Sequence, residues 1–123
     1  MTRVQQASTV KVFSQADFDN FARLSGDNNP IHTDPEFSAN TRFGRTVAHG
    51  LLLCSVLRGL IDRLMPDQRL SEQSVIFPAP TYADEPMNFT VIMASNSTGE
   101  LELEVKRLDD GVVTCQGHAR VMT

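Results

Sequence analysis

The sequence predicts an α+β fold in which a curved antiparallel sheet wraps around one long helix. Residues 50–66, GLLLCSVLRGLIDRLMP, place apolar side chains at helical spacing. Residues 101–106, LELEVK, alternate strictly between apolar and charged side chains, which indicates a strand with one buried and one solvated face. A helix of this length needs a sheet to cover its apolar side, so both patterns belong to one layered α+β structure.

Length and composition match one globular domain spanning residues 1–123. The chain is 41% hydrophobic and 21% charged, as in ordinary soluble domains. Its net charge of −4 argues against a nucleic-acid partner, because phosphate neutralisation needs a basic face. No stretch approaches the roughly 20 apolar residues of a membrane span, and residues 1–10 lack a signal peptide's apolar segment. We therefore expect a cytoplasmic protein without a membrane partner, in which Cys54 and Cys115 are reduced core residues.

The first half of the chain predicts a strand over residues 4–13 and then helices. Ser14, with Asp17 three residues later, is typical of a capping box, and Gly26 marks the end of that helix. Asp34 reads as the N-cap of a second, short helix that runs to about Arg42. We expect inward-facing apolar side chains from both helices: Phe18, Phe21, Ala22, Leu24, Phe37 and Phe43.

The long helix over residues 50–66 should be largely buried, since residues 51–54 are apolar all round, and Pro66 ends it. Arg58 interrupts the apolar pattern, and Asp62 is placed to pair with it; a role in a subunit interface is the alternative. The sheet-facing positions recur at helical spacing: Leu53, Val56, Leu57, Leu60, Ile61 and Leu64.

The second half predicts a meander of four antiparallel strands, over residues 73–79, 87–94, 101–108 and 112–122. Turn-forming residues occupy 96–99 and 109–111. In the last strand two alternating sets separate, with Val113, Cys115, Gly117, Ala119 and Val121 on the buried side and Thr114, Gln116, His118 and Arg120 on the solvated side.

Residues 25–34, SGDNNPIHTD, gather polar side chains just after a predicted helix. Pro30 stiffens this segment and keeps Asn29 out of the helical region, so a fixed turn aims Asp27 and His32 at one point. A carboxylate and an imidazole that share a water molecule can transfer protons near neutral pH. An ordinary turn aspartate with a loop histidine is the alternative, and Asp34 is better explained as a helix cap. Three such groups are a weak pattern for a metal site, and we expect none.

Two segments resemble a known family. Residues 21–32, FARLSGDNNPIH, continuing to Ser38 and Ala39, are similar to the hydratase-2 signature of MaoC-like, (R)-specific enoyl-CoA hydratases. Residues 47–52, VAHGLL, are similar to the second recurring block of that family. The sequence departs from the family at residues 82–85, where a Gly-Asp turn is common, and at Thr46, where proline is common.

The resemblance implies a hot-dog fold and a hydro-lyase that adds water reversibly across the 2,3-double bond of an enoyl thioester, without a cofactor. Asp27 and His32 would hold the catalytic water, with Asp27 favoured as base and His32 as its acid-side partner, although the sequence leaves this assignment open. Asn29 would orient the loop or the water. The amide of Gly50, at the start of the long helix, would stabilise the thioester oxyanion.

Other residues near this site keep two interpretations each. His49 either orients its own loop or touches substrate, and Ser55 faces either the pocket or the core. Arg42 and Arg45 either meet the phosphates of the thioester carrier or lie in a solvated loop. His118 reads as a surface residue.

Several questions of function stay open at this level. The substrate is an acyl-CoA or an acyl-carrier-protein thioester, and its acyl chain and the physiological direction are undetermined. A hot-dog thioesterase or a non-catalytic acyl-thioester-binding subunit is the alternative to a hydratase. Because a small sheet needs cover for its edge, we expect a homodimer.

Overall fold

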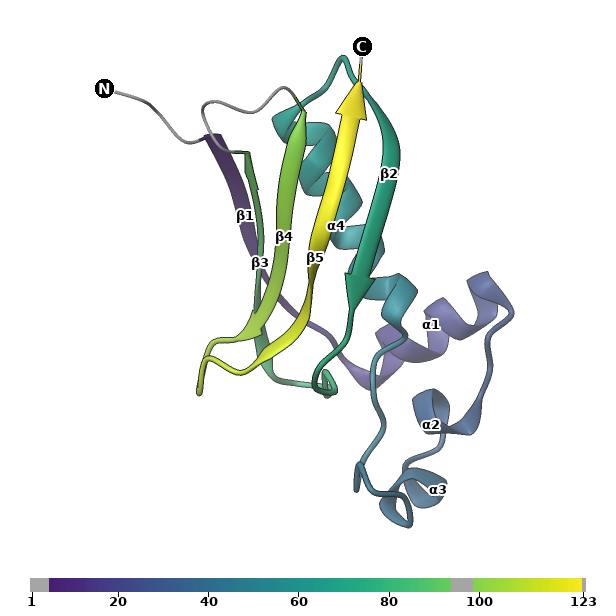
Figure 1. Ribbon diagram of the computed structural model, residues 1–123. Helices are drawn as coiled ribbons and strands as arrows, with labels where there is room; N and C mark the ends of the chain where they lie inside the picture. The colour runs from purple at the N-terminus through teal and green to yellow at the C-terminus, as the bar shows by residue number, and fades with distance from the viewer. Residues whose placement is uncertain (1–4, 94–98, 123) are drawn as a thin grey trace.

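The computed structural model describes residues 5–93 and 99–122, which form five strands and four helices. Figure 1 shows a curved sheet with α4 across one face and the three short helices near the start of α4. The predicted α+β fold is confirmed. In chain order the elements are β1 (Gln5–Val12), α1 (Gln15–Ser25), α2 (Pro30–Thr33), α3 (Pro35–Ala39), α4 (Gly50–Leu64), β2 (Arg69–Ile76), β3 (Pro86–Met93), β4 (Glu100–Arg107) and β5 (Val113–Met122).

The strand order is β1-β3-β4-β5-β2, with every neighbouring pair antiparallel. The predicted meander is therefore correct for β3, β4 and β5 and wrong for β2, which pairs with β5 at the opposite edge from β1. The connection after β2 explains this placement, because Tyr82 forms a β-bridge with Val47 and the amide of Ala48 donates to the carbonyl of Thr81. These contacts carry the chain past the start of α4 before β3 begins.

The helix caps follow the sequence prediction. Ser14 Oγ accepts from the amide of Asp17, and Asp17 Oδ2 accepts from the amide of Ser14, which completes a capping box. Gly26 ends α1 in the left-handed conformation, with φ of 81°. Asp34 Oδ1 accepts from the first two free amides of α3, so Asp34 is a helix cap. That helix ends at Ala39, short of the predicted Arg42, because Asn40 forms its C-cap.

The core lies between the apolar side of α4 and the inner face of the sheet. Phe18 of α1 closes one end of this layer. The buried side chains alternate along β3, β4 and the second half of β5, which confirms the predicted period of two for these segments. The largest contributors are Leu57, Ile61, Met87, Phe89, Leu101 and Val105.

Three apolar side chains predicted to face inward are exposed instead. Leu24 is 83% exposed because it follows Phe18 by six residues, which places it off the buried stripe of α1. Leu51 is 68% exposed since α4 turns only one side toward the sheet, so the start of this helix is not buried all round. Phe37 is 46% exposed on the short helix α3.

Both cysteines are free thiols, as predicted. Cys115 is fully buried in the core and Cys54 is half-buried. Burial raises the pKa of the Cys115 thiol to about 12, and Cys54 beside it adds to this shift. Within residues 5–93 and 99–122, none of the helices has the length and apolar character needed to cross a lipid bilayer.

Candidate active site

The turn between α1 and α2 is fixed by hydrogen bonds at both ends. The amide of Gly26 donates to the carbonyl of Ala22 at 2.9 Å, which closes α1. Asn29 Oδ1 accepts from the amide of Ile31 at 3.1 Å and so caps α2, which begins at Pro30. The stiff turn predicted around Pro30 is therefore present, and the side-chain oxygen of Asn29 serves the backbone of the turn.

This turn brings Asp27 and His32 together. Asp27 Oδ2 lies 3.8 Å from His32 Nε2, a separation beyond a direct hydrogen bond and suited to two groups that share one water molecule. The side chain of Asp27 is 56% exposed, whereas that of His32 is 11% exposed. The pair thus combines a fixed, buried imidazole with a carboxylate that solvent or a ligand can reach.

The tautomer of neutral His32 follows from its second contact. His32 Nδ1 lies 2.8 Å from the carbonyl oxygen of Val47. A carbonyl only accepts, so Nδ1 carries the proton and donates it. The lone pair of the neutral ring is then on Nε2, the nitrogen that faces Asp27.

His49 joins this pair to the start of α4. Its ring stacks on His32 with centroids 3.8 Å apart and meets the edge of Phe21. His49 Nε2 donates to the backbone carbonyl of Asp27 at 2.9 Å. Burial lowers the pKa of His49; a positive charge on His32 would lower it too, whereas the contacts with Asp27 oppose the shift. The structure therefore holds His49 as a neutral ring that positions the loop, in agreement with one of its two predicted roles.

Gly50 begins α4, so its amide belongs to the first turn, whose amides have no acceptor within the helix. A Cβ at this position would lie 2.7 Å from Cζ of Phe77, so a larger residue would require the ring of Phe77 to move. A cavity of about 370 Å³ adjoins Gly50, and Asp27 and His32 do not line it. The link between that cavity and the acid–imidazole pair is His49, the residue directly before Gly50.

Ser55 is not brought to the Asp27–His32 pair. It is exposed on α4, and its hydroxyl donates to the carbonyl of Leu52, one turn earlier, at 2.7 Å. It lines a separate hollow of about 330 Å³ with Thr9, Lys11 and Arg63. The side chain of Ser55 therefore lies neither in the pocket beside Gly50 nor in the core, the two environments that were predicted for it.

The sequence analysis did not identify two buried threonines that line the cavity at Gly50. Thr81, in the loop after β2, is 3% exposed, and Thr114 is fully buried; both line the cavity at Gly50. The prediction that Thr114 lies on the solvated side is wrong because a β-bulge opposite Val105 and Lys106 shifts the alternation of β5. No sequence signal marks that bulge, and the proline-rich loop around Thr81 has no period to read.

Asp27, His32 and His49 each have a ligand-type atom, and these atoms lie within 4.8 Å of one another. The two imidazoles are stacked, with 23° between their planes. Lone pairs that lie in two nearly parallel planes do not meet at one nearby point, whereas the ligands of a tetrahedral metal site must converge on the ion. This geometry suits hydrogen bonding better than metal binding.

The remaining charged residues lie outside this cluster. Arg58 pairs with Asp62 at 3.1 Å, which confirms the predicted ion pair on α4. The guanidinium of Arg42 lies over the ring of Phe43, and Arg45 donates to the carbonyl of Ala83, so neither is held by the acid–imidazole pair.

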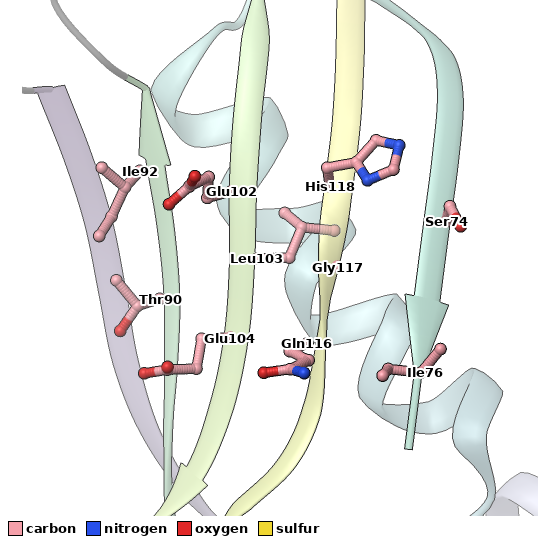
Figure 2. A pocket seen from close by; sticks show the side chains of 10 residues that line it. All are labelled: Ser74, Ile76, Thr90, Ile92, Glu102, Leu103, Glu104, Gln116, Gly117 and His118. Atoms are coloured by element: carbon pink, nitrogen blue, oxygen red, sulfur yellow. The ribbon is translucent and has the colours of Figure 1, made fainter. Parts of the chain in front are cut away.

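A larger hollow of about 590 Å³ lies on the outer face of the sheet, with α4 behind the strands (Figure 2). Its polar side chains come from β2, β3, β4 and β5: Ser74, Thr90, Glu102, Glu104, Gln116 and His118. His118 is exposed there, as predicted. This hollow shares no lining residue with the cavity at Gly50.

A five-stranded antiparallel sheet around one helix, with an acid–imidazole pair beside the start of that helix, defines a hot-dog protein with the groups for proton transfer. Residues 2–114 match the family described as MaoC like domain, and the chain belongs to this family. The solved (R)-hydratase from A. caviae has the same fold, with a TM-score of 0.87 and 30% identity over 98% of this chain and 96% of that one.

Curated relatives carry related names. The (R)-specific enoyl-CoA hydratase of Aeromonas caviae is 34% identical over 89% of this chain and 76% of its own length. The 3-hydroxybutyryl-CoA dehydratase of Methylorubrum extorquens is 30% identical over 80% of this chain. The mitochondrial 3-hydroxyacyl-[acyl-carrier-protein] dehydratase of Arabidopsis thaliana is 33% identical over 72% of this chain. The chain spans 56% and 54% of the lengths of these last two relatives.

Proposed function

We propose that the protein is an (R)-specific enoyl-thioester hydratase, or in reverse a 3-hydroxyacyl-thioester dehydratase. The observation that carries this proposal is the 3.8 Å approach of Asp27 Oδ2 to His32 Nε2, the ring nitrogen that is not bonded to the carbonyl of Val47. The names of the relatives support it, since they are hydratases and dehydratases of CoA and acyl-carrier-protein thioesters. Water is the only co-reactant, so no cofactor enters the proposal.

The proposed chemistry begins with one water molecule between Asp27 and protonated His32. Asp27 takes a proton from the water while the water oxygen bonds to C3 of the enoyl group. The electrons of the double bond move toward the thioester oxygen, where the amide of Gly50 at the positive end of α4 stabilises the charge. His32 protonates C2, and transfer of the proton from Asp27 to His32 restores the pair.

The same proposal includes a homodimer of domains that each span residues 1–123. Both β1 and β2 are outer strands in the described sheet, and an outer strand presents free backbone groups. Ile76 and Phe77, at the end of β2, are 59% and 47% exposed, and Leu51 in the first turn of α4 is 68% exposed. Pairing of two copies would cover such surface, and light scattering should then give twice the chain mass of 13.6 kDa. The two free thiols support a reducing compartment such as the cytoplasm.

A spectrophotometric assay tests the activity directly. Purified protein mixed with crotonyl-CoA should remove the enoyl absorbance and form 3-hydroxybutyryl-CoA, and chiral analysis should give the (R) product. The same assay with crotonyl-acyl-carrier protein compares the two carriers. Release of free CoA while the enoyl absorbance persists would indicate a thioesterase, and binding without turnover would indicate an acyl-thioester-binding subunit; either result contradicts the proposal.

A further inference from the structure

The cavity at the start of α4 has a lining that the catalytic pair does not explain. It occupies about 370 Å³ between the segment before α4, the loop after β2 and the inner face of β5. Its lining combines apolar side chains, such as Phe77 and Leu53, with Gly50, Thr81 and Thr114. Both threonines are buried, and neither hydroxyl has a hydrogen-bond partner within the described part of the chain.

Unpartnered buried hydroxyls are unusual, because nearly all buried polar groups in proteins are hydrogen-bonded. A site that leaves such a group unpaired in the free protein often gains the partner from a ligand. Thr114 lines the cavity directly, and rotation about χ1 moves its hydroxyl from one staggered position to another. The hydroxyl can therefore turn toward a ligand without any change in the backbone.

A backbone irregularity places Thr114 there. Val105 pairs with Cys115 and Lys106 pairs with Val113, so Thr114 is the extra residue of a β-bulge. Regular alternation would send Thr114 to the outer face with Gln116; the bulge instead leaves Thr114 and Cys115 both buried. Bulges recur beside active sites, where they redirect a side chain.

The chemistry of the lining selects the kind of ligand. The free amide at the start of α4 and the two hydroxyls are hydrogen-bond donors, and the described residues that line the cavity include no aspartate or glutamate. Arg42, also in the lining, pairs with no carboxylate among the described residues and adds positive charge. Such a cavity favours an acceptor oxygen that is neutral or gains negative charge.

We propose that Thr114 Oγ1 donates a hydrogen bond to the thioester carbonyl oxygen of the bound substrate, as a second donor beside the Gly50 amide. This inference rests on the proposed function, in which that oxygen gains charge as water adds. Two donors directed at the oxygen stabilise the transition state more than the ground state. Thr114 is then a catalytic residue supplied by the bulge in β5.

Thr114→Val tests the hydroxyl while keeping the shape of the side chain. We expect kcat for crotonyl-CoA hydration to fall about 100-fold with KM changed less than threefold, the pattern for loss of one oxyanion donor. Thr114→Ser, which keeps the hydroxyl, should stay within about fivefold of wild type. Thr90→Val is the matched control, since Thr90 lies on the outer face of the sheet (Figure 2).

Stability separates this role from a structural one. The hydroxyl has no partner among residues 5–93 and 99–122, so Thr114→Val should keep or raise the thermal midpoint while activity falls. Wild-type kcat in Thr114→Val, or equal losses in the valine and serine variants, would overturn the inference. A fall in the thermal midpoint that accompanies the loss of activity would do the same.

A binding measurement keeps this test independent of turnover. Butyryl-CoA labelled with ¹³C at the thioester carbonyl is saturated and cannot be hydrated, and difference infrared spectroscopy reports its carbonyl stretch on the protein. We expect a lowered frequency on wild type that returns toward the free value on Thr114→Val. An unchanged frequency would contradict the inference, whereas inactive wild type with the expected shift would contradict only the hydratase assignment.

Discussion

The rings of His32 and His49 stack face to face. Each ring also donates a hydrogen bond to a backbone carbonyl in the segment that precedes the other histidine. His32 Nδ1 donates to Val47, two residues before His49, and His49 Nε2 donates to Asp27, five residues before His32. The turn that carries the acid is thereby tied to the segment that starts α4. One small network thus sets the position of Asp27 relative to Gly50, although these residues are 23 positions apart in the chain.

Asp27→Asn and His32→Gln should each lower kcat for crotonyl-CoA hydration at least 100-fold. The first change removes the carboxylate that takes the proton, and the second replaces the imidazole with an amide that cannot exchange protons near neutral pH. Steady-state kinetics on both variants check this, with circular dichroism to confirm folding.

The matched control for these variants is Asp34→Asn. Asp34 caps α3 in the same polar segment, and asparagine caps helices as well as aspartate does. Its activity should stay within twofold of wild type. Wild-type activity in Asp27→Asn and His32→Gln, as in Asp34→Asn, would show that the acid–imidazole pair is not the catalytic centre.

Two glycines of α4 should respond in opposite directions to alanine. In Gly50→Ala the new Cβ would lie 2.7 Å from Cζ of Phe77, so this half-exposed ring must turn aside, at a cost of about 0.5–1.5 kcal/mol of folding stability. In Gly59→Ala no atom outside the helix lies within 4 Å, and the helix gains about 0.5–1 kcal/mol. Urea unfolding of both variants measures the difference.

The hydratase activities of these two glycine variants provide a second test. Gly50→Ala should also lose hydratase activity, because Phe77 or the first turn of α4 must move, while Gly59→Ala should keep it. A stable and fully active Gly50→Ala protein would show that close approach to this glycine is not needed.

Acid should destabilise the fold through His49. Burial lowers its pKa below the ordinary value of 6.5, so between that value and the folded-state value the unfolded chain binds more protons than the native protein. The stabilising contribution is complete above about pH 6.5 and is lost as pH falls through this window. Thermal midpoints recorded from pH 8 to pH 5 should therefore fall less steeply in His49→Gln than in wild type. Parallel curves for the two proteins would contradict this assignment.

Cys115 should resist alkylation in the native protein. Its thiol is fully buried and its pKa is raised to about 12, so almost no thiolate exists at pH 8. Iodoacetamide labelling followed by mass spectrometry should modify Cys54 slowly and Cys115 only after urea is added. Labelling of both cysteines at one rate in native buffer would show that the core opens around β5.

Local chemistry made much of the structure predictable. Ser14, Gly26 and Asp34 terminate helices through contacts with residues within four positions, so their roles could be read from the sequence. The alternation in β3, β4 and β5 identified the buried face for the same reason. The approach of Asp27 to His32 also depends on a short, proline-stiffened segment.

Long-range geometry was not readable in this way. The pairing of β2 with β5 depends on the connection that crosses the start of α4, and the inward turn of Thr114 depends on a bulge that no local pattern encodes. The distance of Ser55 from the acid–imidazole pair likewise follows from the direction of α4 and not from the residues around it.

The strand order has a consequence for how the chain is made. β1 is held by β3, with Gln5 opposite Met93, and β2 is held by β5, with Arg69 opposite Met122. Only the β3–β4 and β4–β5 contacts join sequence neighbours, so closing each outer pair costs about 2 kcal/mol more in chain entropy. A nascent chain on the ribosome cannot finish the sheet until its final strand emerges, and the helical segments synthesised first must wait for it. We therefore expect β1 and α4 to need protection by chaperones until β5 has been synthesised.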